Sequence, residues 1–430
     1  MKLLRPRLSG IAAALGLSAW LAASVAMPCA GAATTWTIEP GNGRLAKALA
    51  LAEPGDELKL RAGLHQGPVI ISKPVELNGE AGAVLDGGGA SRTITVNAPD
   101  VTIRGIEVRG SGGLLETEDS GIFITESGDR ARIEGNQLTG NLIGIYLKGP
   151  EDARVIDNRI QGRKDLRLNE RGNGIQLWNT PGSIIEGNEI TDGRDGIFVT
   201  TSKRNIFRNN RFRNVRFGVH YMYTNDSEVS GNLSQGNHLG YAIMYSARIR
   251  MTGNRSEGDR DRGIMLNYTN QSEFLGNSVT GGAQKCVFIY NANRNQFRDN
   301  RFEGCGIGIH FTAGSEHNVI SGNAFMANRT QVKYVGSRYV EWSEKGRGNY
   351  WSDNLAFDLD GDGRADRPYK PNDLVDQLVW RHPSAKLLLT SPAMQVLRWA
   401  QSALPALYPG GVTDSAPLML PPAILAYKER

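Results

Sequence analysis

The sequence is dominated by an internal repeat of 22 or 23 residues. An Asn that follows Gly, Asp or Asn returns at this spacing, with one longer step of 30 residues that holds an insertion within residues 161–171. The marker residues are Asn136, Asn158, Asn188, Asn210, Asn232, Asn254, Asn277, Asn300 and Asn323. A unit this short cannot bury an apolar face alone, whereas stacked units can. The chain is therefore expected to be a repeat protein.

A second element, G-I-x-apolar, recurs in phase with the marker Asn, as in GIFI from Gly121 and GVHY from Gly218. The residue three places before each marker is always apolar, from Ile133 to Ile320. Short strands that pair in parallel one coil apart, about 4.8 Å, would bury these columns. The pattern predicts an all-β, right-handed parallel β-helix of the pectin-lyase-like type, with about 12 coils. The marker Asn residues should stack inside a bend, each amide bonded to the next coil.

Both ends of such a stack expose strand edges and need cover. Residues 45–52 predict a short helix that caps the first coil, since Pro54 and Gly55 end it. Ser391 followed by Pro392 predicts a helix start, and Ala393, Val396, Leu397, Ala400, Ala403 and Leu404 then share one face. The apolar tail of residues 418–427 is too short to span a bilayer. We expect a β-helix domain over residues 33–383 and a helical arm with an apolar tail over residues 384–430.

Residues 1–32 have the features of a cleaved signal peptide. Lys2, Arg5 and Arg7 precede an apolar stretch, and Ala30 and Ala32 fit a small-x-small cleavage site. An uncleaved membrane anchor is the alternative. The 49 Lys and Arg against 44 Asp and Glu give a net charge of +5, which falls to +2 without the leader. So weak a basic excess argues against a nucleic-acid-binding protein.

The outward side chains of the G-I-x-apolar strands hold a group of soft metal ligands. Alternation along each strand directs the second and fourth residues after the Gly outward. His220, Met222, Met244 and Met265 then lie on one face across three coils, with Ala242 leaving room between them. Thioether and imidazole ligands suit Cu(I) better than zinc or calcium. The sequence predicts a Cu(I) site here, to which His238 could add; an apolar interaction surface is the alternative.

Two further features carry possible chemistry. Asp358, Asp360, Asp362 and Asp366 occupy positions 1, 3, 5 and 9 of a calcium-loop pattern, although Tyr369 replaces the Glu at position 12. This predicts a calcium-like loop, with a simple acidic turn as the alternative. Cys286 and Cys305 remain after leader removal, and they could be soft ligands, a disulfide or small buried side chains.

The sequence contains few residues that are arranged as in known catalytic sites. The two outward columns contain no Asp or Glu and a single Lys, Lys148, and the NTD, GHG and RIK motifs of polygalacturonases do not occur. We therefore expect a protein that is not an enzyme. A polysaccharide lyase or epimerase, which would need carboxylates with Lys or Arg in a groove, is the alternative.

Several segments resemble the NosD family of periplasmic copper-binding β-helix proteins. They are PGDELKLRAGLHQGPVIISKPVELNGE from Pro54, VLDGGG from Val84, APDVTIRGIEVRGSG from Ala98 and GNYWSDNLAFDLDGDGRADRPY from Gly348. The resemblance implies a periplasmic accessory protein for building the copper centres of nitrous oxide reductase during denitrification. It also implies three kinds of partner: an ABC-type ATPase with its membrane permease, a copper chaperone lipoprotein and nitrous oxide reductase itself. The C-terminal arm is expected to dock on the permease.

Overall fold

The computed structural model describes residues 33–404, apart from residues 313 and 337, and residues 410–423. The predicted signal peptide, residues 1–32, and the end of the apolar tail lie outside this part of the chain. Among the described residues, no helix is both long enough and apolar enough to cross a bilayer.

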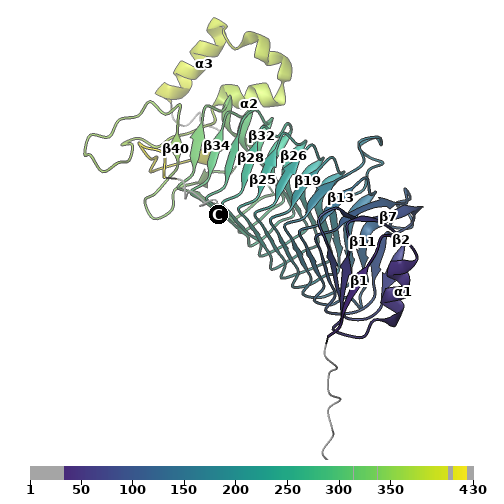
Figure 1. Cartoon of the computed structure of the whole chain (residues 1–430). Helices are drawn as coiled ribbons and strands as arrows, with labels where there is room; N and C mark the ends of the chain where they lie inside the picture. Colours follow the sequence, from purple (N-terminus) through teal and green to yellow (C-terminus); the bar gives the residue numbers. More distant parts are fainter. Residues whose placement is uncertain (1–32, 313, 337, 405–409, 424–430) are drawn as a thin grey trace, which may run out of the picture. The chain divides into compact units, whose positions relative to one another are not determined.

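The strands of residues 35–351 form a parallel β-helix of three sheets and stack coil upon coil (Figure 1). Sheet A has 13 strands, from β1 (Thr35–Ile38) to β36 (Val319–Ser321); sheet B has 14, from β2 (Gly41–Asn42) to β40 (Tyr350–Trp351); and sheet C has 12, from β5 (Val69–Ile71) to β38 (Thr330–Val335). The predicted fold class is confirmed, but the coil number is about 14 rather than about 12. The first coils lack the marker Asn and differ in length, so the repeat did not count them.

Sheet C carries the face on which the sequence placed the metal ligands. Every pairing in it is parallel and joins equivalent positions of successive coils. The strands in this region are β17 (Ile175–Trp178), β20 (Asp195–Thr200), β23 (Phe217–Met222), β26 (Leu239–Met244), β29 (Arg262–Asn267), β32 (Lys285–Tyr290) and β35 (Ile307–Thr312).

The marker Asn residues form the predicted hydrogen-bonded ladder inside the bend between sheets A and B. From Asn136 to Asn300, each Nδ2 donates to Oδ1 of the next marker at 2.8–3.0 Å. The ladder continues from Asn323 to Asn349, beyond the last predicted marker. It ends on Asp414, whose Oδ2 accepts from the backbone N of Asn349 at 2.7 Å and from Trp351 Nε1 at 2.8 Å.

The two ends of the solenoid are covered as its open strand edges require. Helix α1 (Arg44–Leu51) buries Leu45, Ala48 and Leu49 against the first coils, which confirms the predicted cap. At the other end, β41 (Val412–Thr413) pairs in parallel with β39 (Val340–Glu341). Burial raises the pKa of Asp414, although hydrogen bonds from the Asn349 backbone amide and the Trp351 indole favour its ionised form. Residues 410–419 therefore close the last coil.

Helices follow the solenoid near the C-terminus. Helix α3 (Pro392–Ala403) begins as predicted, with Ser391 as its N-cap. The sequence missed α2 (Leu374–Arg381), which has a capping box formed by Asp373 and Asp376 and is followed by the 3-10 helix η1 (Pro383–Leu388). Met394 and Leu397 of α3 pack against α2, whereas Val396 and Leu404, predicted on the same apolar face as Leu397, are exposed.

Candidate metal centre

The backbone register brings the predicted copper ligands together on the outer face of sheet C. His220, Ala242 and Met265 occupy one column of equivalent positions, and Met222 pairs with Met244 in the column beside it. Neighbouring coils are about 4.8 Å apart, and positions two residues apart on a strand are separated by about 6.6 Å. The three methionines are half-buried, and Ala242 is fully buried between His220 and Met265. We name His220, Met222, Met244 and Met265 the copper stripe.

His220 is held in place by an ion pair that sequence reasoning missed. Its Nδ1 lies 2.9 Å from Oδ2 of Asp195, and Arg216 binds the same carboxylate through Nε at 2.8 Å and Nη2 at 2.7 Å. Burial opposes ionisation of Asp195, but the hydrogen bonds from His220 and Arg216 keep its pKa below the usual value. In the neutral imidazole, a proton on Nδ1 that is donated to Asp195 leaves the lone pair on Nε2, as in the carboxylate–histidine pairs of metal sites.

Aromatic rings enclose the imidazole of His220. Phe198, on the preceding coil, lies 5.0 Å away between ring centroids, and Phe217, on the same strand, also lies at 5.0 Å. His220 is only 8% exposed as a result. The low polarity of this surrounding strengthens the interaction between Asp195 and His220.

Met265 has a neighbour that bears on metal binding. Its Sδ lies 3.5 Å from Nη1 of Arg262, whose guanidinium also lies 4.9 Å from the ring centroid of Phe288. A cation bound at Met265 would be repelled by this charge, which the ion pair of the same Nη1 with Asp261, at 2.9 Å, offsets only in part. Within the copper stripe, a cation is therefore bound most favourably near His220, Met222 and Met244.

The structure does not gather every predicted side chain into this group. The contacts of His238 are with Phe217, at 6.5 Å between ring centroids, and with Asp261, rather than with a methionine. His310 lies one coil beyond Phe288, with the ring centroids 5.1 Å apart. Met251 is fully buried in the inner column.

Cys286 and Cys305 form a disulfide with a Cα–Cα distance of 5.7 Å. Cys286 takes the place of the repeat Gly in β32, and Cys305 follows β34 (Arg301–Glu303) on the next coil. Of the three uses that the sequence left open, the structure supports the disulfide, which fits an oxidising compartment.

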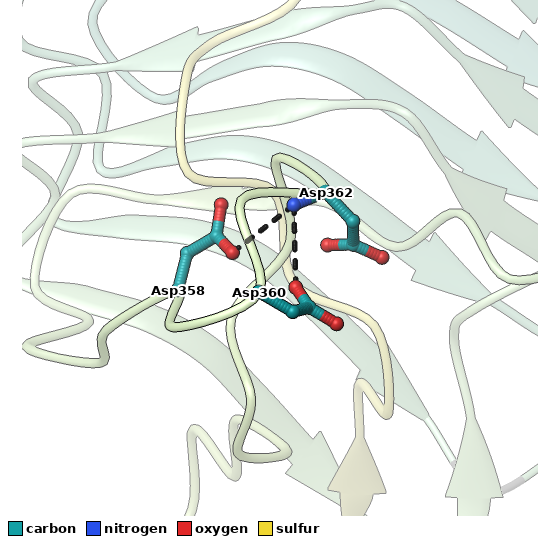
Figure 2. Close-up of side chains that lie close together, drawn as sticks. All are labelled: Asp358, Asp360 and Asp362. Atoms are coloured by element: carbon teal, nitrogen blue, oxygen red, sulfur yellow. Dashed lines mark hydrogen bonds between the residues drawn. The ribbon is translucent and has the colours of Figure 1, made fainter.

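The predicted calcium loop partly converges (Figure 2). Oxygen atoms of Asp358, Asp360 and Asp362 lie within 4.8 Å of one another, and Asp358 accepts hydrogen bonds from the amides of Gly361 and Gly363. The Gly363 amide contributes most to a lowered pKa of Asp358. Asp366 instead accepts from the amide of Leu359 at 3.0 Å. Three of the four carboxylates thus face a common point on an exposed loop.

Comparison with known proteins identifies the family of this chain. The family model of the periplasmic copper-binding protein (NosD) matches residues 156–356, which include the whole copper stripe. A probable ABC transporter binding protein NosD from Pseudomonas aeruginosa is 44% identical over 402 residues, or 88% of this chain and 94% of the relative. The chain belongs to the NosD family. A second NosD protein, from Stutzerimonas stutzeri, is 43% identical and covers 84% of this chain and 86% of its own.

NosD is a family of periplasmic copper-binding proteins, so the sequence correctly predicted the family, the metal and the compartment at this level. Its relatives are named as binding proteins and not as enzymes, which agrees with the prediction of a non-enzymatic protein. Two solved structures share only the fold. A PL6 family polysaccharide lyase from Pseudopedobacter saltans has a TM-score of 0.54 at 14% identity, covering 68% of this chain and 84% of its own. An Azotobacter vinelandii mannuronan C-5 epimerase module has a TM-score of 0.53 at 14% identity, covering 68% and 90%.

The NosD chain has a third outward column that sequence reasoning did not consider. From β20 to β35 it consists of the residues just before the repeat Gly, or before Cys286 in its place: Asp195, Phe217, Leu239, Arg262, Lys285 and Ile307. Both this residue and the second residue after the Gly face outward, so a residue in this column contacts the residue three places later, as Phe217 contacts His220. The fixed position before the Gly is the signal that would have revealed Asp195 and Arg262.

Proposed function

We propose that this NosD protein binds Cu(I) at the copper stripe and supplies it for assembly of the copper centres of nitrous oxide reductase. Family membership and the register of His220, Met222 and Met244 support the proposal. In it, Nε2 of His220 and the thioether sulfurs of the methionines bind the copper cargo. Asp195 and Arg216 fix the orientation of the imidazole, and Phe198 and Phe217 limit access of water.

The proposed partners follow from the family and from the exposed C-terminal surface. They are an ABC-type ATPase with its membrane permease, a copper chaperone lipoprotein that brings copper, and nitrous oxide reductase that receives it. A cleaved signal peptide over residues 1–32 would export the protein to the periplasm.

Methionine substitution tests copper binding directly. Met222→Leu with Met244→Leu should leave the fold intact and weaken Cu(I) binding at least tenfold, about 1.4 kcal/mol, because Leu keeps the apolar volume and removes the sulfur. Competition with a Cu(I) chelator measures this. The matched control replaces Met326 and Met419, two half-buried methionines outside the stripe. Equal affinity of the stripe variant and the parent would refute the copper stripe.

The lyase or epimerase alternative has one feature in its favour. A shallow groove on sheet A is lined by carboxylates and arginines, among them Glu57, Arg104, Arg132 and Glu134. However, Arg104 lies 3.3 Å from Glu76, and Arg132 lies 2.6 Å from Glu134. Since these charges are already paired, we prefer the copper-handling function. Measurable cleavage or epimerisation of alginate or pectin by the purified protein would reverse that preference.

We further propose that the helical arm docks on the permease. Its exposed apolar side chains include Leu387, which is 88% exposed, and Val396, which is 62% exposed. Removing the chain after residue 409 would also remove Asp414 and β41, so substitution is the better test. Leu387→Ser with Val396→Ser should abolish co-purification with the transporter. Leu355→Ser with Leu359→Ser, on an equally exposed loop, is the control; retained co-purification of the arm variant would refute the docking role.

The Asp358 loop is proposed to bind calcium as a structural ion. Binding to the folded state alone would stabilise it. Excess EDTA should then lower the melting temperature of the parent by several degrees and leave that of an Asp360→Asn, Asp362→Asn variant unchanged. Identical melting of the parent with and without EDTA would identify the loop as an acidic turn.

A further inference from the structure

An exposed stack of tyrosines borders the copper stripe. Tyr223, Tyr245 and Tyr268 stand one residue after the ends of β23, β26 and β29, and Tyr290 ends β32. The centroids of successive rings are 5.1, 5.1 and 6.0 Å apart, and the first three rings are nearly parallel. The four side chains are between 39% and 53% exposed. We name these four residues the tyrosine ladder.

The backbone under this ladder is unusual for aromatic residues. Tyr223, Tyr245 and Tyr268 have φ values of 50°, 49° and 51°, in the left-handed region that favours Gly and Asn. Equivalent bends in other coils have Gly149, Asn179 and Asn291. The fold thus does not require Tyr at these positions. These three tyrosines follow the three strands that carry the copper stripe.

A group of positive charges continues the same face toward the C-terminus. Arg262 and Lys285 lie on adjacent coils beside the ring of Phe288, with their charged groups 4.9 Å from its centroid. Lys333 lies two coils beyond Lys285, next to His310. Within the described residues, Arg262 has an ion pair with Asp261, whereas none is found for Lys285 or Lys333. We name Arg262, Lys285 and Lys333 the cationic patch.

Two properties of this face favour a protein partner. The patch extends over four coils, about 14 Å from Arg262 to Lys333, which suits several carboxylates on one surface better than one small anion. The tyrosine side chains are exposed, and Tyr and Arg are enriched in protein interfaces, where they contribute much of the binding energy.

The geometry points to a docking surface in which the tyrosine ladder and the cationic patch bind an acidic protein beside the copper stripe. The inference rests on the proposed function, since the docked protein would give copper to the stripe or take it away. Acidic side chains of the partner would meet Lys285 and Lys333, and its apolar surface would cover the tyrosine ladder. This would place the metal ligands of both proteins within one interface.

The test uses two purified proteins, the soluble part of the copper chaperone lipoprotein and nitrous oxide reductase. One of them should bind the immobilised full-length mature protein, with an affinity that falls as salt is raised from about 50 to about 300 mM. Lys285→Glu with Lys333→Glu should weaken this binding at least tenfold, and so should Tyr245→Ser with Tyr268→Ser. The matched control is Arg132→Glu with Arg154→Glu, on the exposed strands β12 (Arg132–Glu134) and β15 (Arg154–Ile156) of sheet A, which should bind as the parent does.

The inference is overturned if neither protein binds, or if both variants bind as tightly as the parent. Binding to vesicles of phosphatidylcholine and phosphatidylglycerol that is lost on charge reversal would assign the face to the membrane and would also overturn it. Circular dichroism and thermal melting check that each variant is folded. Chelator competition separates the two proposals. A charge-reversed protein that binds Cu(I) as tightly as the parent but no longer binds the partner supports the docking surface, even if the parent itself binds Cu(I) weakly.

Discussion

The inner and outer sides of β23, β26 and β29 follow different rules although they belong to the same strands. Inward, Val219, Tyr241 and Ile264 are aligned, and each is buried in the core. Outward, the aligned residues are His220, Ala242 and Met265, which share neither size nor polarity. The repeat that specifies the fold is confined to the interior. The outer face is therefore free to vary from coil to coil and to carry function.

Substitution of one inward and, separately, one outward asparagine should show this contrast most strongly. Asn232 bonds to Asn210, Asn254 and the carbonyl of Phe207, all buried. Asn232→Ala would leave several of these groups without partners, so we expect a loss of about 3 kcal/mol or more in unfolding free energy, measured by denaturant titration.

The outward residue Asn267 is the control for this substitution. Its Oδ1 has no hydrogen-bond partner, so Asn267→Ala should change the unfolding free energy by less than about 0.5 kcal/mol. Similar losses for the two variants would show that the outer face also specifies the fold.

A smaller effect is expected where an outer residue is half-buried. Burial, and then the charges of Lys285, Lys333 and Arg262, lower the pKa of His310 from 6.5 to about 4. Between these values the unfolded chain takes up a proton that the folded protein does not. The contribution of His310 to the free energy of unfolding is therefore complete above about pH 6.5. It declines as the pH falls toward 4, by about 1 kcal/mol after allowance for partial exposure.

Denaturant unfolding at pH 5 and pH 7.5 measures this dependence. His310→Phe should reduce the difference between the two conditions, whereas His317→Phe, at an exposed position, should leave it as in the parent. An unchanged difference in the His310 variant would show that the outer face is not coupled to stability there.

The smallest expected effect concerns metal affinity on the outer face alone. Arg262→Gln removes a positive charge next to Met265 and should strengthen Cu(I) binding about threefold in chelator competition, less so at high salt. Arg260→Gln is the control, because Arg260 is exposed and bonds to the carbonyl of Gly236. Weaker binding by the Arg262 variant would mean that this side chain supports the site.

The interior was predictable because its chemistry is the same in every coil. The marker Asn fixes the register between coils. Alternation along each strand then assigns each side chain to the inner or the outer face, which is why His220 and Met244 could be placed from the sequence. The residue before each Gly was missed because alternation was followed only from the Gly onward. The contact of Asp195 with His220 joins two neighbouring coils. It depends on the directions of both side chains, which the sequence pattern does not specify. Helix α2 was missed because its capping residues, Asp373 and Asp376, lie outside the repeat.

The asparagine ladder repeats once per coil, so the length of the β-helix is set in whole coils. Its amides all point the same way and its last donor meets Asp414, so a coil can be added or removed whole, between ends that stay unchanged. Met244 on β26 lies four coils before Lys333 on β38, about 19 Å along the axis. Insertion of one complete coil between β29 and β38 would shift the copper stripe by about 4.8 Å relative to the last coil. The spacing between copper and the end where the chain turns into its helices can thus evolve only in steps.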